Sequence, residues 1–196
     1  MAAPLGRKYR CTVLLERNEI SYPIQKSQSM LCCCDVAYGH DRAVAAAVFF
    51  HDWADPSATG KHWVESTSAA GYKPGEFYRR ELPILSRLLE THRPKLKTII
   101  VDGYVWLDHD RPGLGHYLYE EFECEIPVVG IAKNSFKDNG AAVSVLRGKS
   151  QKPLWVTAVG CEAAQAARSL QSMHGPFRIP TLLKAADTLC REKLKG

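Results

Sequence analysis

Three β-type segments come first in this chain, and helical and β-type segments alternate after them. Apolar and β-branched residues predict strands over residues 30–38, 43–50 and 62–67, separated by glycine, aspartate and proline turn signals. Consecutive strands joined by turns favour antiparallel pairing, whereas parallel strands need a longer crossover, usually a helix. The order of elements therefore predicts one mixed sheet flanked by helices, which is an α/β architecture.

The later elements follow from helical periodicity and from glycine and proline breakers. They are a helix opened by Pro74-Gly75 and running to about Glu90, strands over 97–102 and 126–132, a helix from the 111–115 turn to about Glu123, a β pair over 142–146 and 153–158, a helix over 160–173 and a last helix from near Pro180. A lead-in strand is expected over residues 8–16. The length of 196 residues suits one domain better than two, so we expect a single domain over residues 1–196 with its motifs between about 30 and 190.

Composition narrows the class of protein less than the order of elements does. The formal net charge of +5 is mild, but it favours a polyanion such as nucleic acid over a cationic ligand. No apolar run approaches the roughly 20 residues of a membrane span, and the N-terminus lacks the apolar stretch of a signal peptide. We therefore expect no membrane partner and a cytoplasmic location, or a nuclear one in a eukaryote. The seven cysteines form no C-x-x-C pair, and most are expected to be reduced core thiols.

Two aspartates end apolar β-type runs, and one glutamate falls on the apolar side of a helix. Asp35 ends a run that begins at Met30, and Asp102 ends one that begins at Thr98. A carboxylate in that place is held at the edge of a sheet, where hard cations bind. Glu81 has apolar residues four positions before and after it, and an ionised glutamate there is costly without a cation or hydrogen-bond partners. Singly, each acid also fits a turn former or a solvated side chain.

The order of these acids agrees with one known architecture. A ribonuclease H-like fold has the same succession of elements, with acidic residues from its first strand, first helix and fourth strand, as in Asp35, Glu81 and Asp102. Phosphodiester hydrolysis needs an activated water, neutralised phosphate charge and help for the leaving oxygen, and one or two Mg²⁺ ions supply all three. The sequence therefore predicts a ribonuclease H-like mixed β-sheet flanked by helices, with a Mg²⁺-dependent nuclease site.

Three further features suit a nucleic-acid substrate, and each has a plainer alternative. Lys133 follows a predicted strand, where it would neutralise a phosphate or assist proton transfer, or would be an ordinary surface lysine. Tyr72 stands in the stiff loop 71–75, where it would stack on a base or wedge into a duplex, or pack over the helix start. The basic run 147–152, which includes Lys149, would grip phosphates or form a solvated hairpin tip.

Taken together and in order, these motifs resemble the endonuclease V family over most of residues 30–190. The segments that carry the resemblance are Asp35-Val36-Ala37-Tyr38 with Arg42-Ala43-Val44-Ala45, Tyr72-Lys73-Pro74-Gly75 with Arg80-Glu81-Leu82-Pro83, Val101-Asp102-Gly103, Val129-Gly130-Ile131-Ala132-Lys133, Lys149 with Pro153-Leu154-Trp155-Val156, and Gly175 to Asp187 with Arg178-Ile179-Pro180.

The resemblance implies an activity, a cofactor and a set of site residues. The implied cofactor is Mg²⁺, with Mn²⁺ as an alternative. The implied reaction is nicking of DNA or RNA on the 3′ side of a deaminated base, chiefly hypoxanthine (inosine). The altered base would be taken out of the base stack for recognition. The expected state is a monomer bound to inosine-containing nucleic acid. The implied site residues are metal ligands at Asp35, Glu81 and Asp102, a phosphate or catalytic partner at Lys133, a wedge at Tyr72, Pro74 and Gly75, and a further contact at Lys149.

One position departs from the family pattern. The family has Gly-His and then a basic residue, whereas here Cys161 and Glu162 follow Gly160. The histidine that helps at the metal site is therefore expected to be absent, with Cys161 as its candidate replacement, and a neutral thiol favours softer metals than Mg²⁺. Two alternatives stay open: a protein that binds deaminated or branched nucleic acid without efficient cleavage, and a different ribonuclease H-like nuclease without a preference for inosine.

Overall fold

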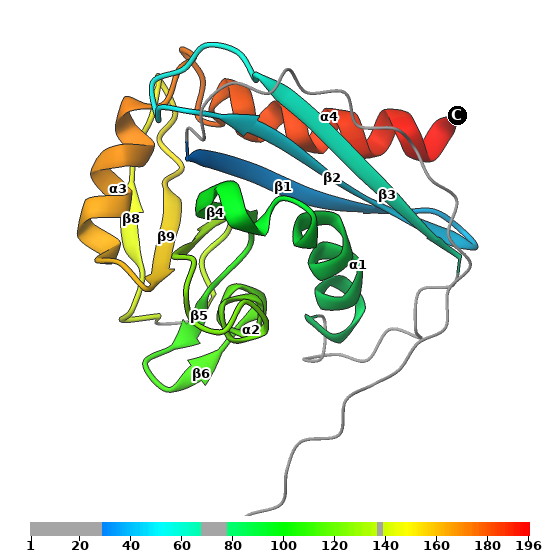
Figure 1. The fold of residues 1–196 in the computed structure, drawn as a ribbon. Helices are drawn as coiled ribbons and strands as arrows, with labels where there is room; N and C mark the ends of the chain where they lie inside the picture. Colours follow the sequence, from blue (N-terminus) through cyan, green and yellow to red (C-terminus); the bar gives the residue numbers. More distant parts are fainter. Residues whose placement is uncertain (1–28, 68–77, 137–138) are drawn as a thin grey trace, which may run out of the picture.

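The computed structural model describes residues 29–67, 78–136 and 139–196, and these form a seven-stranded sheet with helices on both faces (Figure 1). The strand order is β3-β2-β1-β4-β7-β9-β8. Its strands are β1 (Met30–Tyr38), β2 (Arg42–Phe50), β3 (Gly60–Thr67), β4 (Leu96–Asp102), β7 (Val128–Ala132), β8 (Val143–Val145) and β9 (Leu154–Val159). The helices are α1 (Tyr78–Glu90), α2 (Leu114–Glu121), α3 (Ala163–Ser172) and α4 (Thr181–Lys195).

The sheet is mixed, as predicted, and its strand directions follow from the connections. Strands β1, β2 and β3 are joined without an intervening helix and pair antiparallel. Helices α1 and α2 carry the chain back across the sheet, so that β4 lies parallel to β1 and β7 parallel to β4. Strand β9 is antiparallel to both β7 and β8. The carboxyl ends of β1, β4 and β7 therefore meet at one edge of the sheet.

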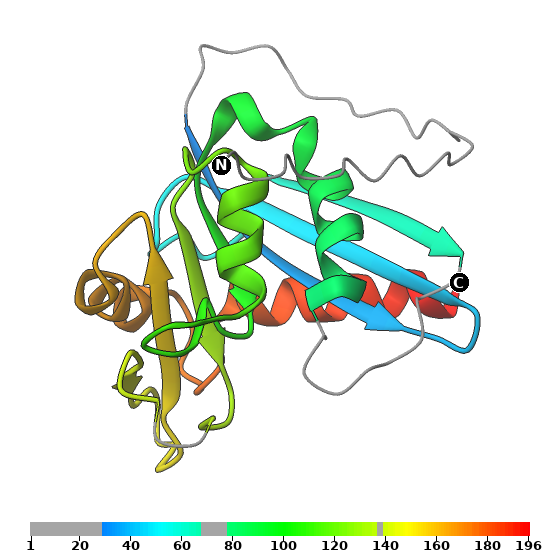
Figure 2. The same ribbon diagram turned by 90° about the horizontal axis from the view of Figure 1, so that it is seen from below.

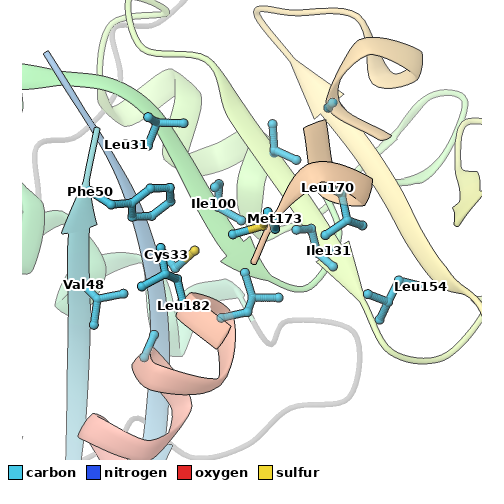
Figure 3. Close-up of a cluster of buried hydrophobic side chains, with 14 of the residues drawn as sticks. Leu31, Cys33, Val48, Phe50, Ile100, Ile131, Leu154, Leu170, Met173 and Leu182 are labelled. Atoms are coloured by element: carbon cyan, nitrogen blue, oxygen red, sulfur yellow. The ribbon is translucent and has the colours of Figure 1, made fainter. Parts of the chain in front are cut away.

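Strand β1 lies between β2 and β4, and its first five residues are buried, which explains their unbroken apolar run. Helices α1 and α2 cover one face of the sheet, and α3 and α4 cover the other (Figure 2). Successive side chains alternate between the faces, so Cys32 and Cys34 belong to the core beneath α1 and α2. Cys33 belongs to the core beneath α3 and α4 (Figure 3). Phe49 and Phe50 on β2 divide in the same way and are both 0 % exposed. Burying one such side chain contributes about 1.5–3 kcal/mol, so both cores fix the sheet firmly.

The predicted elements match the observed ones closely, with a few differences. A small two-stranded sheet of β5 (Trp106–Asp108) and β6 (Arg111–Pro112) was not predicted, and a 3₁₀ turn (Arg93–Lys95) follows α1. Pro180 caps α4 from the position just before the helix. The predicted strand over 8–16 and the Pro74-Gly75 helix start lie outside the described residues. No helix in the described ranges is long and apolar enough to span a membrane.

Candidate active site

Asp35 and Asp102 lie side by side where the pairing of β1 with β4 ends, Asp35 within β1 and Asp102 as the last residue of β4. Cys34 on β1 pairs with Val101 on β4, so the next residue on each strand is an aspartate. Burial raises the pKa of Asp35 to about 6, and repulsion from Asp102 adds to this effect, although the Val36 N–H donates a hydrogen bond to Asp35 Oδ1 at 2.8 Å. The two predicted carboxylates are therefore adjacent, although β1 continues for three residues beyond Asp35, and their repulsion would be relieved by a cation.

Glu81 reaches the same region from the first turn of α1. Only 5 % of Glu81 is exposed, as its place on the apolar face of the helix predicts. Burial raises the pKa of Glu81 to about 8, and repulsion from Asp35 and Asp102 contributes. The Tyr38 hydroxyl donates a long hydrogen bond of 3.4 Å to Glu81 Oε1. A carboxyl group this strongly disfavoured as an anion gains most from a positive neighbour.

Lys133 brings a positive charge to the aspartates. Ile131 on β7 pairs with Asp102 on β4, and Lys133 follows two residues later, where its ammonium forms an ion pair with Asp102 Oδ2. Burial lowers the pKa of Lys133, but the hydrogen bond to Asp102 outweighs it, so the net pKa is raised and the lysine stays charged. The Arg178 guanidinium donates hydrogen bonds to the carbonyl oxygens of Lys133 and Pro153, which fixes the backbone from which the lysine projects.

A fourth acid, Asp187, joins this site from α4 and was not predicted as a site residue. It is 8 % exposed, and Lys184 Nζ and Arg191 Nε each lie 2.5 Å from one of its oxygens. Burial raises the pKa of Asp187, but the hydrogen bonds from Lys184 and Arg191 outweigh it and hold the pKa below its usual value. The signal that singled out Glu81 applies here too, because Leu183 and Cys190 place Asp187 on the apolar face of its helix.

Asp35, Asp102, Lys133 and Asp187, but not Glu81, line one pocket. Its volume of about 70 Å³ has room for a few water-sized groups. It is lined by residues from β1, the end of β4, the loop after β7, the loop before α4 and the first two turns of α4: Cys34, Asp35, Asp102, Lys133, Ile179, Leu183, Lys184 and Asp187.

The structure does not bring Cys161 to this pocket. Strand β9 runs antiparallel to β7, so Val159 at its end pairs with Val128 at the start of β7, whereas Lys133 follows the opposite end. Cys161 is exposed beyond Val159, at the other edge of the sheet. Cys161 was expected as the replacement of a metal-site histidine, and the structure places it away from Asp35 and Asp102. The further side chain that lines the pocket with them is Asp187.

The predicted nucleic-acid contacts are only partly within the described residues. Tyr72, Pro74 and Gly75 lie outside them. Lys149 is exposed in the turn between β8 and β9. Gly148, directly before it, has a φ of +58° and fits tightly against the loop that precedes α4, because an added Cβ would lie 2.4 Å from the Pro176 oxygen. Lys149 is therefore on a turn that contacts the loop leading to the pocket.

The donor set fits a hard divalent cation by its chemistry. Asp35, Glu81, Asp102 and Asp187 supply carboxylate oxygens, which Mg²⁺ and Mn²⁺ prefer, and the repulsion among the first three would be relieved by such a charge. Over residues 29–67, 78–136 and 139–196, no three His, Cys, Asp or Glu side chains converge closely enough to form a ready-made metal site. Ammonium groups instead neutralise Asp102 and Asp187.

The strand order and strand directions of this mixed sheet define a protein of the ribonuclease H-like fold class, and comparison of structures confirms that fold. The crystal structure of Ciona intestinalis endonuclease V, in complex with a 24-mer DNA containing an inosine followed by a ribo-adenosine, superposes with a TM-score of 0.72 at 21 % identity, covering 85 % of this chain and 86 % of that one. Human endonuclease V gives a TM-score of 0.69 at 21 % identity, covering 86 % and 85 %.

The chain belongs to the endonuclease V family, whose sequence model matches residues 14–174. The endonuclease V of Streptomyces avermitilis is 29 % identical over 183 residues, covering 82 % of this chain and 79 % of that protein. Its crystal structure matches with a TM-score of 0.67 at 27 % identity, covering 86 % and 82 % of the two chains. The resemblance seen in the sequence is thus confirmed. The protein is an endonuclease and therefore a hydrolase, and its membership of this family supports action on deaminated DNA.

Proposed function

We propose that this protein is a metal-dependent endonuclease that hydrolyses a phosphodiester bond beside a deaminated base, hypoxanthine in the form of inosine, in DNA or RNA. The observation that carries the proposal is the convergence of Asp35, Asp102, Asp187 and Lys133 on one pocket, with Glu81 buried beside it. Family membership supports nuclease chemistry, and the inosine-containing DNA bound by the Ciona intestinalis relative supports the lesion.

Each side chain of the pocket has a role in this proposal. Asp35, Glu81, Asp102 and Asp187 would hold Mg²⁺, or Mn²⁺ in its place. When bound, such an ion supplies charge neutralisation on the phosphate and an activated water for attack. Lys133 remains charged beside Asp102, so its ammonium is available to a phosphate oxygen of the strand being cut.

We propose further residues that hold the substrate. Tyr72, Pro74 and Gly75 are proposed as the wedge that separates strands, and Lys149 as a phosphate contact, with the altered base taken out of the stack where its pairing is weakest. We propose that one domain, acting as a monomer, carries the whole activity. The choice between DNA and RNA depends on contacts to the 2′-hydroxyl.

A second candidate function is recognition of deaminated or branched nucleic acid with little cleavage. The observation that favours it is the neutralisation of Asp102 by Lys133 and of Asp187 by Lys184 and Arg191. A divalent cation must compete with these ammonium and guanidinium groups. A protein in which it competes poorly would bind its substrate and cut it slowly.

Cleavage of end-labelled single-stranded DNA and RNA, each with and without one inosine, distinguishes the two functions. The reactions would contain Mg²⁺, Mn²⁺ or EDTA, with Asp35→Asn as the inactive variant and the exposed Asp110→Asn as its matched control. We expect inosine-dependent nicking that needs the metal, disappears in Asp35→Asn and persists in Asp110→Asn. Tight binding without nicking in either metal would favour the recognition protein, and cleavage indifferent to inosine would contradict the proposed substrate.

A further inference from the structure

Phe177 is unusual among the described residues because its large apolar side chain is exposed. It is 74 % exposed, and Leu146 at 55 % is the other large hydrophobic residue of the described ranges that lies open to solvent. An exposed aromatic ring contributes little to folding, since burial of apolar surface is what stabilises the folded state. The ring of Phe177 is therefore free to contact a partner.

The backbone beneath this ring is held in place. The guanidinium of Arg147, which is only 7 % exposed, donates hydrogen bonds to the carbonyl oxygens of Phe177 at 2.9 Å and Gly175 at 3.3 Å, and also to that of Met173. Phe177 is thus presented on a loop that folding has already ordered. A preordered contact residue binds more tightly because less conformational entropy is lost on binding.

The position of Phe177 ties it to the acid pocket. Arg178, the next residue, is hydrogen-bonded to the backbone of Lys133, and Ile179 lines the pocket itself. Since two residues span at most about 7 Å of chain, the backbone of Phe177 lies within that distance of the pocket wall. The ring is therefore within reach of a strand whose phosphate binds at the acids.

The surroundings of the ring favour a polyanion. Residues 139–187 contain six lysines and arginines and two acids, Glu162 and the pocket residue Asp187. Lys149 and Lys152 are exposed in the turn between β8 and β9, and Gly148 of that turn fits against Pro176, directly before Phe177. An aromatic ring on a basic surface is how proteins bind single-stranded nucleic acid, with the base stacked on the ring and the phosphates near the cations.

We propose that Phe177 is a stacking platform for an unpaired nucleobase of the bound strand, next to the pocket, with Lys149 and Lys152 near the phosphates of the same segment. This inference rests on the proposed function and adds a subsite to it. It assigns to the loop before α4 a part in substrate binding and none in bond cleavage.

Binding to a single-stranded oligonucleotide with one inosine tests the platform. The linkages around the lesion would be phosphorothioates, so that the strand survives titration in Mg²⁺, and fluorescence anisotropy would report the Kd. Phe177→Ala is expected to weaken binding about 5- to 100-fold, Phe177→Trp to retain it, and Phe177→Leu to behave like Phe177→Ala. Because the side chain is exposed, all three variants should keep the melting temperature of the parent.

A series of oligonucleotides with one abasic position would locate the stacked base. At that position the abasic change should weaken binding by the parent protein and have no further effect on Phe177→Ala. Lys149→Gln should instead reduce the salt dependence of binding, with the exposed Lys195→Gln as the matched control.

The outcomes separate the subsite from the proposed function. If the parent binds and cuts inosine-containing strands while Phe177→Ala binds equally well, the platform is refuted and the nuclease stands. If Phe177→Leu binds like the parent, or no abasic position cancels the effect of Phe177→Ala, the contact is not base stacking and the proposal fails. If the parent binds no nucleic acid, the platform and the proposed function fall together.

Discussion

Lys133 forms an ion pair with Asp102 across the ends of two neighbouring parallel strands. Replacing Lys133 with Gln should have two opposite effects. Divalent-metal binding should tighten about fivefold, because Asp102 is released from its partner, and kcat/KM should fall about 100-fold, because phosphate charge is no longer neutralised. Calorimetric titration with Mn²⁺ and single-turnover cleavage of inosine-containing DNA measure the two effects. Weaker metal binding by this variant would show that the lysine does not compete with the metal.

In the metal-free protein, the buried Glu81 carboxylate should lower the free energy of unfolding, and a bound metal should remove this cost. This carboxyl group is 5 % exposed and is repelled by Asp35 and Asp102. In EDTA at pH 8, Glu81→Gln should raise the free energy of unfolding by about 1–3 kcal/mol, while cleavage in Mg²⁺ is lost. Urea unfolding measures the stability, and Mg²⁺ should stabilise the parent more than the variant. The exposed Glu90→Gln on the same helix serves as control, and a destabilised Glu81→Gln would count against this account.

Asp187 should matter for the metal more than for the fold. Asp187→Asn keeps the shape of the side chain and loses its charge, so we expect a higher Mn²⁺ requirement and at least a 100-fold lower kcat/KM at limiting metal. Its ion pairs involve Lys184 and Arg191, which are 62 % and 66 % exposed, so their loss should cost about 1 kcal/mol or less.

Two control variants separate these roles of Asp187. Lys184→Gln and Arg191→Gln break the same ion pairs but keep the carboxylate, and they should retain cleavage. Equal loss of activity in all three variants would mean that the ion pairs, and not a metal, are what Asp187 provides.

Stability at mildly acidic pH should depend on His92. This ring is buried against Phe49, with a centroid distance of 4.4 Å, and its Nε2 lies 3.0 Å from His62 Nδ1. Burial lowers the pKa of His92 from 6.5 to about 4, and repulsion from His62 contributes. Between pH 6.5 and pH 4, His92 is therefore protonated in the unfolded chain and neutral in the folded chain. The free energy of unfolding should fall by on the order of 2 kcal/mol from pH 7 to pH 4.

Urea unfolding between pH 7.5 and pH 4.5 measures this dependence on His92. His92→Gln should show a shallower decline than the parent, and the exposed His40→Gln should follow the parent. A decline of the same slope in all three proteins would place the acid sensitivity elsewhere.

The strand-end acids could be predicted because their signals are local. An apolar run followed by aspartate singles out Asp35 and Asp102 from the sequence alone, although only β4 ends at its aspartate and β1 continues to Tyr38. Glu81 follows from helical periodicity. These acids are close together because β1 pairs with β4 in parallel. The order of elements favours this pairing but does not specify its register.

Other parts of the site depend on contacts that no local pattern contains. Asp187 is joined to the pocket by the packing of α4 across β1, 150 residues away in the chain, and the position after Gly160 drew attention to Cys161 instead. The short β5–β6 sheet was missed because polar residues around Asp108 resemble a plain turn. The exposure of Phe177 is also invisible in the sequence, where an apolar residue is expected to be buried.

The hydrogen bonds of Arg178 have a mechanical consequence. One guanidinium joins the carbonyl oxygens of Lys133 and Pro153, while Arg147 fastens the loop on the other side of Phe177. These hydrogen bonds join the backbone of Lys133, the β8–β9 turn and the loop before α4. A strand bound at this loop would therefore be held in a fixed position relative to the backbone that carries the Lys133 ammonium.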